Sequence, residues 1–124
     1  MTIQVGTRGS LLARLQTDFA LQHLSKLLPG CTFSVQTFDT PGDRDLTTPL
    51  PQTPGDFFTR DLDQAILERR LDLAIHSAKD LPENPPEGVD WIWLPWYEPP
   101  EDCLVLQSGL DLPTFETLSC PRIG

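Results

Sequence analysis

The chain has 124 residues, 39% of them hydrophobic, which is enough to bury one modest core. Its net charge is −9, and its 9 lysines and arginines are scattered, so the composition argues against nucleic-acid binding, which requires clustered cations. No long apolar run is present and the first predicted strand begins almost at Met1, so we expect a cytoplasmic protein without a membrane span or secretory signal. The cysteines, Cys31, Cys103 and Cys120, are odd in number and lack metal-ligand spacing, so we expect neither a disulfide framework nor a metal site.

Residues 3–10 predict a strand, a turn and the start of a helix, because apolar residues alternate and Ser10 suits a helix N-cap. From Leu11 to about Leu28, polar residues recur at helical spacing and define one narrow stripe, so we expect the rest of this helix to be covered. Gln16 and His23 lie toward the covered side, where each needs a hydrogen-bond partner or a ligand. For His23 a structural role is the favoured interpretation.

The middle of the chain predicts a second strand, a loop and a second helix. The strand covers residues 31–38 and closes a β-α-β unit with a right-handed crossover. Between Pro41 and Pro54, the spacing of Pro, Thr and Gly predicts a mobile or extended loop, a candidate lid over a crevice. The helix spans about 58–70. Its predicted inner stripe is Leu62, Ala65, Ile66 and Arg69, and its predicted polar side is Asp61, Asp63, Gln64 and Glu68.

The run His76-Ser77-Ala78-Lys79-Asp80-Leu81-Pro82 carries the clearest signal for chemistry. It sets an ammonium beside a carboxylate directly after residues 71–75, an apolar run typical of a buried parallel strand. For Lys79 and Asp80 to serve one pocket, the chain must already turn after this strand. The alternative interpretation is a solvated charged pair in a loop.

Residues 91–96 hold all three tryptophans and predict an aromatic strand, with Trp91 and Trp93 on one face. Such a stripe is more typical of a core than of a ligand platform.

We expect the polar residues that follow the first predicted strand to lie close to those that follow the third. The carboxyl ends of the first and third strands can be neighbours in a parallel sheet, so Arg8, Ser10 and the Lys79–Asp80 pair can converge on one crevice at a helix N-terminus. The sequence therefore predicts an anion-binding site that contains one carboxylate.

These residues make the chain resemble the porphobilinogen deaminase (hydroxymethylbilane synthase) family. The resemblance is most specific over Asp72–Pro82 and extends over nearly the whole chain. The other matching positions are Gly6-Thr7-Arg8-Gly9-Ser10 with Leu12 and Gln16, Gly42-Asp43 with Thr48-Pro49-Leu50, and Phe58 with Leu62 and Ala65.

The resemblance implies an α/β, periplasmic-binding-protein-like domain with a mixed, largely parallel sheet flanked by helices, incomplete at its C-terminal hinge. Residues 1–98 would form the N-terminal domain, and residues 99–124 the hinge and the beginning of a truncated second domain. The remaining enzyme domains are then expected partners, and self-association through an exposed hinge surface is also expected.

The implied reaction is a head-to-tail condensation of four porphobilinogen units with loss of ammonia, which gives a linear tetrapyrrole. It takes place on a dipyrromethane primer attached to a cysteine. None of the three cysteines here matches that attachment position, so no covalently bound cofactor is expected and the fragment alone is expected to be inactive.

The resemblance also implies roles for individual residues. Loss of ammonia leaves an electron-poor azafulvene, and Asp80 would be the catalytic carboxylate that stabilises its positive charge. Phe58 would stack on pyrroles, with a plain core role as the alternative, and Asp43 is a weaker candidate because Gly-Asp turns are common. The residues implied to hold the acetate and propionate arms of the substrate are Arg8, Ser10, Gln16, Ser77 and Lys79.

Two departures from the family pattern favour a second hypothesis. Residues 51–57 contain no lysine where the family has a lysine-bearing, glycine-rich loop, and residues 97–102 lack both arginines of the family's Arg-Glu-Asp-Pro-Arg-Asp. The alternative is therefore a truncated or degenerate homologue that binds a small carboxylate through Arg8, Ser10 and Lys79, or that serves as an interaction module.

Overall fold

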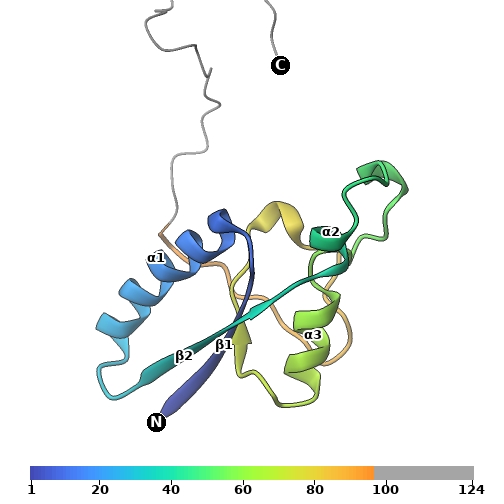
Figure 1. The fold of residues 1–124 in the computed structure, drawn as a ribbon. Helices are drawn as coiled ribbons and strands as arrows, with labels where there is room; N and C mark the ends of the chain where they lie inside the picture. Colours follow the sequence, from blue (N-terminus) through green and yellow to red (C-terminus); the bar gives the residue numbers. More distant parts are fainter. Residues whose placement is uncertain (97–124) are drawn as a thin grey trace, which may run out of the picture.

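The computed structural model describes residues 1–96, in which helices pack on both faces of a small sheet (Figure 1). The strands are β1 (Thr2–Arg8), β2 (Thr32–Phe38) and β3 (Leu73–Ala74), in the order β2-β1-β3. β1 pairs in parallel with β2 from Thr2↔Thr32 to Arg8↔Phe38, and in parallel with β3 at Val5 and Gly6. The α/β class is confirmed, but the sheet of the described residues is parallel throughout, so the expected mixed sheet is wrong for this part.

Helix α1 (Leu11–Leu27) begins as predicted. The Ser10 side chain accepts a hydrogen bond from the Ala13 amide at 3.3 Å and so caps the helix. One face of α1 packs on β1, where Thr17 and Thr7 are both buried and their hydroxyl oxygens lie 2.7 Å apart. This contact fixes the start of α1 over the carboxyl end of β1.

The expectation that α1 is covered outside its polar stripe is wrong for the described structure. Leu11, Leu12 and Leu15 are 72%, 52% and 57% exposed, because only the stripe around Thr17 and Ala20 faces the sheet. The described residues place no second layer against the opposite side of the helix (Figure 1).

The segment predicted as a loop between Pro41 and Pro54 contains regular structure, so that prediction is wrong in two places. A short helix, α2 (Pro41–Arg44), and a 3-10 turn, η1 (Leu50–Gln52), form within it. Helix α2 is stabilised by a capping box in which the Asp43 carboxylate accepts hydrogen bonds from the Thr40 amide at 3.1 Å and the Thr40 hydroxyl at 2.7 Å.

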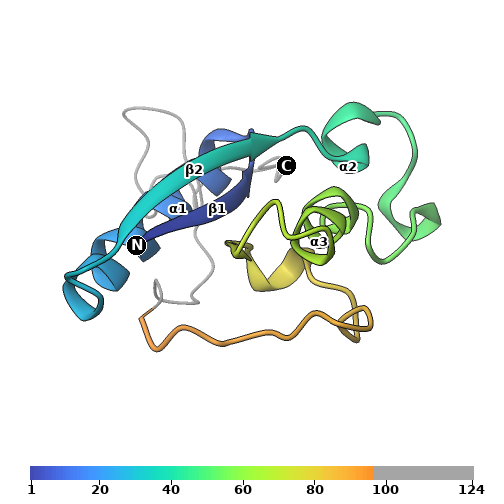
Figure 2. The ribbon, with the colours of Figure 1, turned by 90° about the horizontal axis from the view of Figure 1, so that it is seen from below.

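Helix α3 (Arg60–Leu67) lies on the opposite face of β1 from α1, as Figures 1 and 2 show together. The close approach depends on Gly6, because a Cβ there would collide with the Leu71 side chain and press on Leu62 of α3. Leu62 and Ala65 are buried as predicted.

The predicted bounds of this helix are wrong, because α3 is shorter than the predicted 58–70, and two of its predicted side-chain orientations are also wrong. Arg69, expected to face inward, is exposed and has a φ of 58°, and this left-handed residue follows the end of the helix. Asp63, expected on the polar side, is buried.

Strand β3 is parallel to β1, as predicted, but shorter than the predicted 71–75. Of this run only Leu71 is buried, and Leu73 and Ala74 are half-buried because β3 forms an edge of the described sheet. Hydrogen bonds from Asp72 to the Gln4 carbonyl (2.9 Å) and from Ile75 to the Gly6 carbonyl (3.0 Å) flank the strand. They tie the site-bearing segment to β1.

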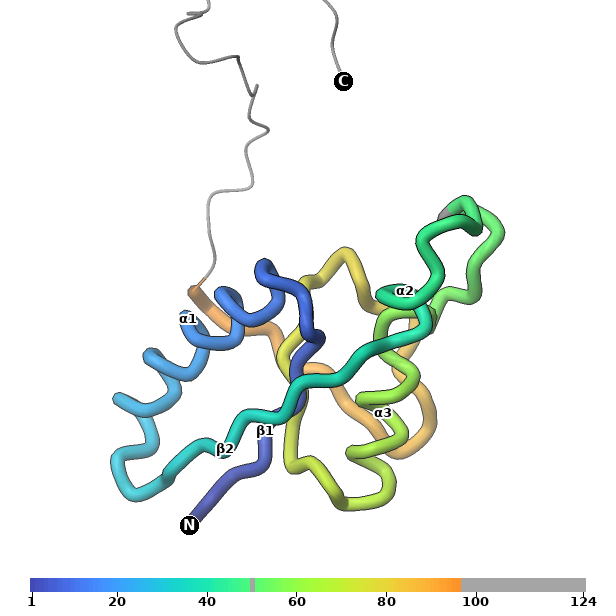
Figure 3. The backbone as a smooth tube through the Cα atoms, in the orientation of Figure 1, coloured from blue at the N-terminus to red at the C-terminus, as the bar shows by residue number. Residues whose placement is uncertain are grey.

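The aromatic segment 91–96 is not a strand, so that prediction is wrong. Trp93 is 70% exposed and Ile92 is 85% exposed, because no strand edge of the described sheet pairs with this segment. Its last residue, Trp96, stacks on His23 of α1 with ring centroids 4.9 Å apart, and Figure 3 shows the chain returning to α1. The domain boundary expected at residue 98 lies outside the described residues, and among those described no helix has the length and apolarity needed to cross a membrane.

Candidate functional site

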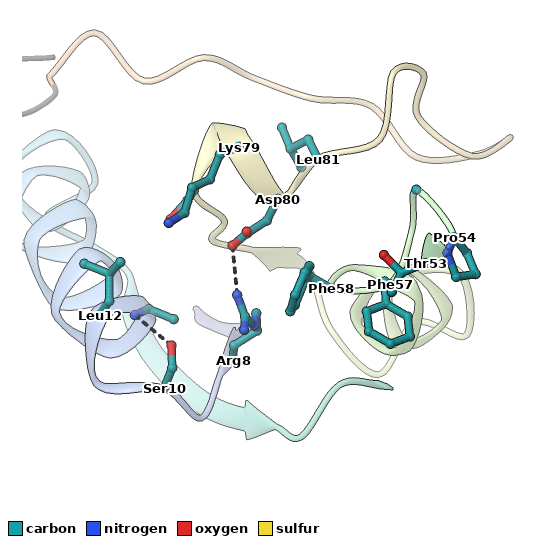
Figure 4. Close-up of a pocket in the computed structure, with 13 residues that line it drawn as sticks. Arg8, Ser10, Leu12, Thr53, Pro54, Phe57, Phe58, Lys79, Asp80 and Leu81 are labelled. Atoms are coloured by element: carbon teal, nitrogen blue, oxygen red, sulfur yellow. Dashed lines mark hydrogen bonds and ion pairs between the residues drawn. The ribbon is translucent and has the colours of Figure 1, made fainter. Parts of the chain in front are cut away.

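The candidate site lies at the carboxyl ends of β1 and β3, where the sequence predicts it. Directly after β3 the chain turns into η2 (Ala78–Asp80), a 3-10 turn that brings Lys79 and Asp80 beside Arg8 and Ser10 (Figure 4). A cavity of about 580 Å³ opens there. It is lined by Arg8, Ser10, Leu12, Ala13, Thr53, Pro54, Gly55, Phe57, Phe58, Ser77, Lys79, Asp80 and Leu81, a set that includes all the predicted site residues except Gln16.

Arg8 is the centre of the site and lies between two carboxylates. Its Nη1 is 2.9 Å from Asp80 Oδ2, its Nη2 is 2.5 Å from Asp43 Oδ1, and its Nε is 3.2 Å from both Asp43 oxygens. The three side chains are only 13–17% exposed. One cation therefore neutralises one of two carboxylates, and the Arg8–Asp43–Asp80 cluster has a net charge of −1.

The electrostatics of this cluster favour its charged form. The hydrogen bond to Asp43 raises the pKa of Arg8, against the opposing effect of burial. Desolvation alone would raise the pKa of Asp43, but hydrogen bonds from Arg8 and Thr40 outweigh it and lower that pKa. Both shifts keep the Arg8–Asp43 pair ionised.

Phe58 covers the Arg8 guanidinium and also packs in the core of the loop region. Arg8 Cζ lies 4.3 Å from the centroid of the Phe58 ring, which is a cation–π contact. The ring also sits against Gly42, where a Cβ would collide with it. Phe58 thus lines the cavity and has the packing role that the sequence left as the alternative.

Gln16 and His23 each find a partner, but neither lines the cavity. Gln16 accepts a hydrogen bond from the Ser77 hydroxyl at 2.5 Å, which links α1 to the segment before η2. His23 Nδ1 lies 2.9 Å from the Phe19 carbonyl of the same helix, and its ring stacks on Trp96. Gln16 therefore supports Ser77, and His23 is structural, as favoured from the sequence.

Lys79 is a cation without a partner among the described residues. It is exposed at the rim of the cavity, and its side chain forms no hydrogen bond or ion pair with another part of residues 1–96. In Figure 4 it extends from η2 toward α1, whose first turn, with Ser10, also borders the cavity. Lys79 and the α1 N-terminus can therefore attract an anion.

Sequence reasoning underestimated Asp43 and did not single out His76, whose buried ring lies directly before the cavity-lining Ser77. A Gly-Asp turn is common, and only the fold reveals the ion pair of Asp43 with a side chain 35 residues earlier. Both ring nitrogens of His76 are buried without a hydrogen-bond partner among the described residues. Desolvation lowers the pKa of His76, against the opposing effects of Asp63 and Asp80. Its place at the head of the Lys-Asp run was the available signal.

Together these features define an α/β domain with a charged, half-enclosed crevice at the carboxyl ends of parallel strands. The chain belongs to the porphobilinogen deaminase family, since residues 3–121 match the family model described as "Porphobilinogen deaminase, dipyromethane cofactor binding domain".

Proteins named porphobilinogen deaminase are similar to most of the chain. It is 38% identical over 118 residues to the chloroplastic porphobilinogen deaminase of Euglena gracilis, covering 94% of this chain and 25% of that protein. It is 36% identical to the porphobilinogen deaminases of Deinococcus deserti and Bacillus subtilis, covering 90% of this chain in each case and 38% and 36% of those proteins. The chain thus spans between about a quarter and two fifths of the length of these relatives.

Proposed function

We propose that this chain is the N-terminal domain of a hydroxymethylbilane synthase and supplies Asp80 as its catalytic carboxylate. In this reaction four porphobilinogen units condense head to tail with loss of ammonia. The observation that supports the proposal is that Arg8, Ser10, Lys79 and Asp80, from two distant parts of the sequence, border one crevice. The family match supports the same assignment.

The surroundings of Asp80 suit the stabilisation of a positive charge. Its Oδ2 accepts a hydrogen bond from Arg8, whereas its Oδ1 has no hydrogen-bond partner among the described residues. Because Arg8 is shared with Asp43, Asp80 keeps part of its negative charge. The free oxygen can accept a pyrrole N–H and stabilise the cation that develops when ammonia leaves.

Other residues suit the carboxylate arms and the rings of a pyrrole substrate. Lys79 supplies an uncommitted ammonium, and Ser10 stands at the positive end of α1. Arg8 is already engaged by two carboxylates, so we propose that it orients Asp80 rather than holding a substrate arm. Phe57 and Phe58 provide apolar walls for the rings.

The described residues also fit part of a dipyrromethane, the cofactor to which the family description refers. The donor set pairs one carboxylate for pyrrole N–H groups with a lysine and a hydroxyl for carboxylate arms, so Asp80, Lys79 and Ser10 would hold the group. When bound, it supplies the pyrrole carbon that the next unit joins. No thiol is among the described residues that line the crevice, and we propose that the attachment cysteine lies in another part of the enzyme.

Further proposals concern partners and location. We propose that residues 1–98 dock against the remaining enzyme domains, and that the enzyme works on porphobilinogen and the growing pyrrole chain in the cytoplasm. The surface expected to mediate self-association falls within residues 99–124, outside the described residues, but α1 offers another exposed apolar surface.

A chimera tests the role of Asp80. This segment is joined to the remaining domains of a competent deaminase, and Asp80→Asn is compared with the parent. The matched control is Asp18→Asn, which makes the same carboxylate-to-carboxamide change at an exposed position on α1. We expect Asp80→Asn to lower kcat by about 100-fold or more and Asp18→Asn to have little effect.

If both chimeras turn over like the parent, Asp80 is not the catalytic carboxylate. The alternative, a small-carboxylate binder, then predicts that the 124-residue chain itself binds porphobilinogen in a calorimetric titration and loses this binding in Lys79→Gln.

A further inference from the structure

We propose that Asp43 is a positioning residue that holds Arg8 and, through Arg8, sets both the orientation and the effective charge of the Asp80 carboxylate. The inference rests on the proposed function of Asp80. It assigns a second acidic residue to the site, one that acts without contacting substrate.

The first argument is the geometry of the guanidinium. Asp43 occupies one edge of it, with Oδ1 at 2.5 Å from Nη2 and both oxygens at 3.2 Å from Nε. Because the guanidinium is planar and rigid, binding this edge fixes its plane. The remaining nitrogen, Nη1, then points at Asp80 Oδ2, 2.9 Å away.

The second argument is that Asp43 is itself held in place. Its Oδ2 accepts hydrogen bonds from the amide and the hydroxyl of Thr40, which is completely buried. The adjacent Gly42 donates its N–H to the Phe57 carbonyl at 3.0 Å and packs against the Phe58 ring. That ring lies against the guanidinium of Arg8. Arg8 is thus fixed from its edge and from one face.

The third argument is the charge balance. Arg8 divides a single positive charge between two carboxylates, so it orients Asp80 without neutralising it. Without the Asp43 charge, Arg8 would pair with Asp80 alone, and Asp80 would stabilise a substrate cation less well.

The test uses the same full-length chimera with Asp43→Asn, which retains the size of the side chain and removes its charge. We expect kcat to fall by about 10-fold and KM for porphobilinogen to change little, because Asp43 acts on Asp80 through Arg8 and does not contact substrate. Asp45→Asn is the matched control, because Asp45 lies in the same segment and its carboxylate accepts hydrogen bonds from Thr47 and Thr48 and not from Arg8. It should leave both kcat and KM unchanged.

A double-mutant cycle separates this inference from the proposed function. Adding Asp43→Asn to Asp80→Asn should cause no further loss, because Asp43 acts only through Asp80. If Asp80→Asn has parental turnover, the proposed function fails. If Asp80→Asn is inactive but Asp43→Asn matches the parent, only the positioning role fails.

Two further outcomes decide the matter. A further loss of kcat when Asp43→Asn is added to Asp80→Asn would reduce Asp43 to structural support and overturn the inference. If Asp43→Asn does not fold, Thr40→Val, which removes one hydrogen bond to Asp43 with little change in volume, should lower kcat by a smaller amount. Parental values in that variant would also overturn the inference.

Discussion

His76 is a half-buried residue whose ring nitrogens are buried, and the fold resists its ionisation. Both ring nitrogens lack hydrogen-bond partners among the described residues, and desolvation lowers the pKa of the imidazole below its ordinary value of 6.5. As the pH falls, the His76 imidazole therefore binds its proton at a higher pH in the unfolded chain than in the folded chain. The stabilisation that comes from neutral His76 is complete above pH 6.5 and is lost as the pH falls through the folded-state pKa.

We predict that the free energy of unfolding of the 124-residue chain decreases as the pH falls from 7.5 toward 5, and that His76→Phe reduces this decrease. Urea unfolding at a series of pH values measures it. The carboxylates whose pKa is lowered have ordinary values of 3.8 for Asp43 and Asp56 and 4.5 for Glu68, so most of their contribution to the pH dependence falls below this window. Ile66→Val, which removes one methyl group at a half-buried position and no ionisable group, is the control and should retain the parental dependence. An identical dependence in His76→Phe would refute the assignment.

At the level of elements, the N-cap of α1 combines a structural and a site role. Ser10 accepts a hydrogen bond from the Ala13 amide, so Ser10→Ala should lower the free energy of unfolding by about 1 kcal/mol. Ser25→Ala is the control, because Ser25 is an exposed serine within the same helix and bonds only to the Leu21 carbonyl. Urea unfolding compares the two, and equal losses would contradict the capping role.

The elements that the sequence predicts well are those with local signals. Strand β1, the Ser10 cap and α1 follow from alternation, capping preference and helical spacing within one stretch of chain. Helix α2 was missed because its capping box, Thr40 with Asp43, lies among residues typical of loops. The strand expected at 91–96 requires a partner strand, and pattern alone does not supply one.

The same distinction applies to the site. Ser10 and the Lys79–Asp80 pair were identified because each lies at the end of an apolar run, and the parallel topology brings them together. The pairing of Arg8 with Asp43, and the covering of its guanidinium by Phe58, depend on contacts between segments distant in sequence. Spacing and composition carry no information about such contacts.

At the scale of the whole molecule, the exposed side of α1 predicts association. Leu11 and Leu15 are both exposed and lie one helical turn apart, so they form a continuous apolar surface on one side of the helix. Single exposed apolar side chains are normal on a protein surface, whereas a continuous apolar surface indicates a contact with another molecule. We predict that the average mass of the chain rises with concentration in size-exclusion chromatography with light scattering, and that Leu15→Gln weakens this rise. Leu67→Gln, at a 45% exposed position on α3, is the control. A monomeric parent at all concentrations would refute the prediction.

The order of strands in the sheet has a consequence for synthesis on the ribosome. β1 is made first and occupies the centre of the described sheet. Its second neighbour, β3, comes much later in the chain, and Asp80, which pairs with Arg8, follows Arg8 by 72 residues. Until that stretch leaves the exit tunnel, one edge of β1 stays open to pairing with other chains and Arg8 lacks one of its two counter-ions. The nascent protein therefore acquires its charged crevice late, and a chain released before residue 80 would have the first β-α-β unit and the Arg8–Asp43 pair but not the Asp80 carboxylate.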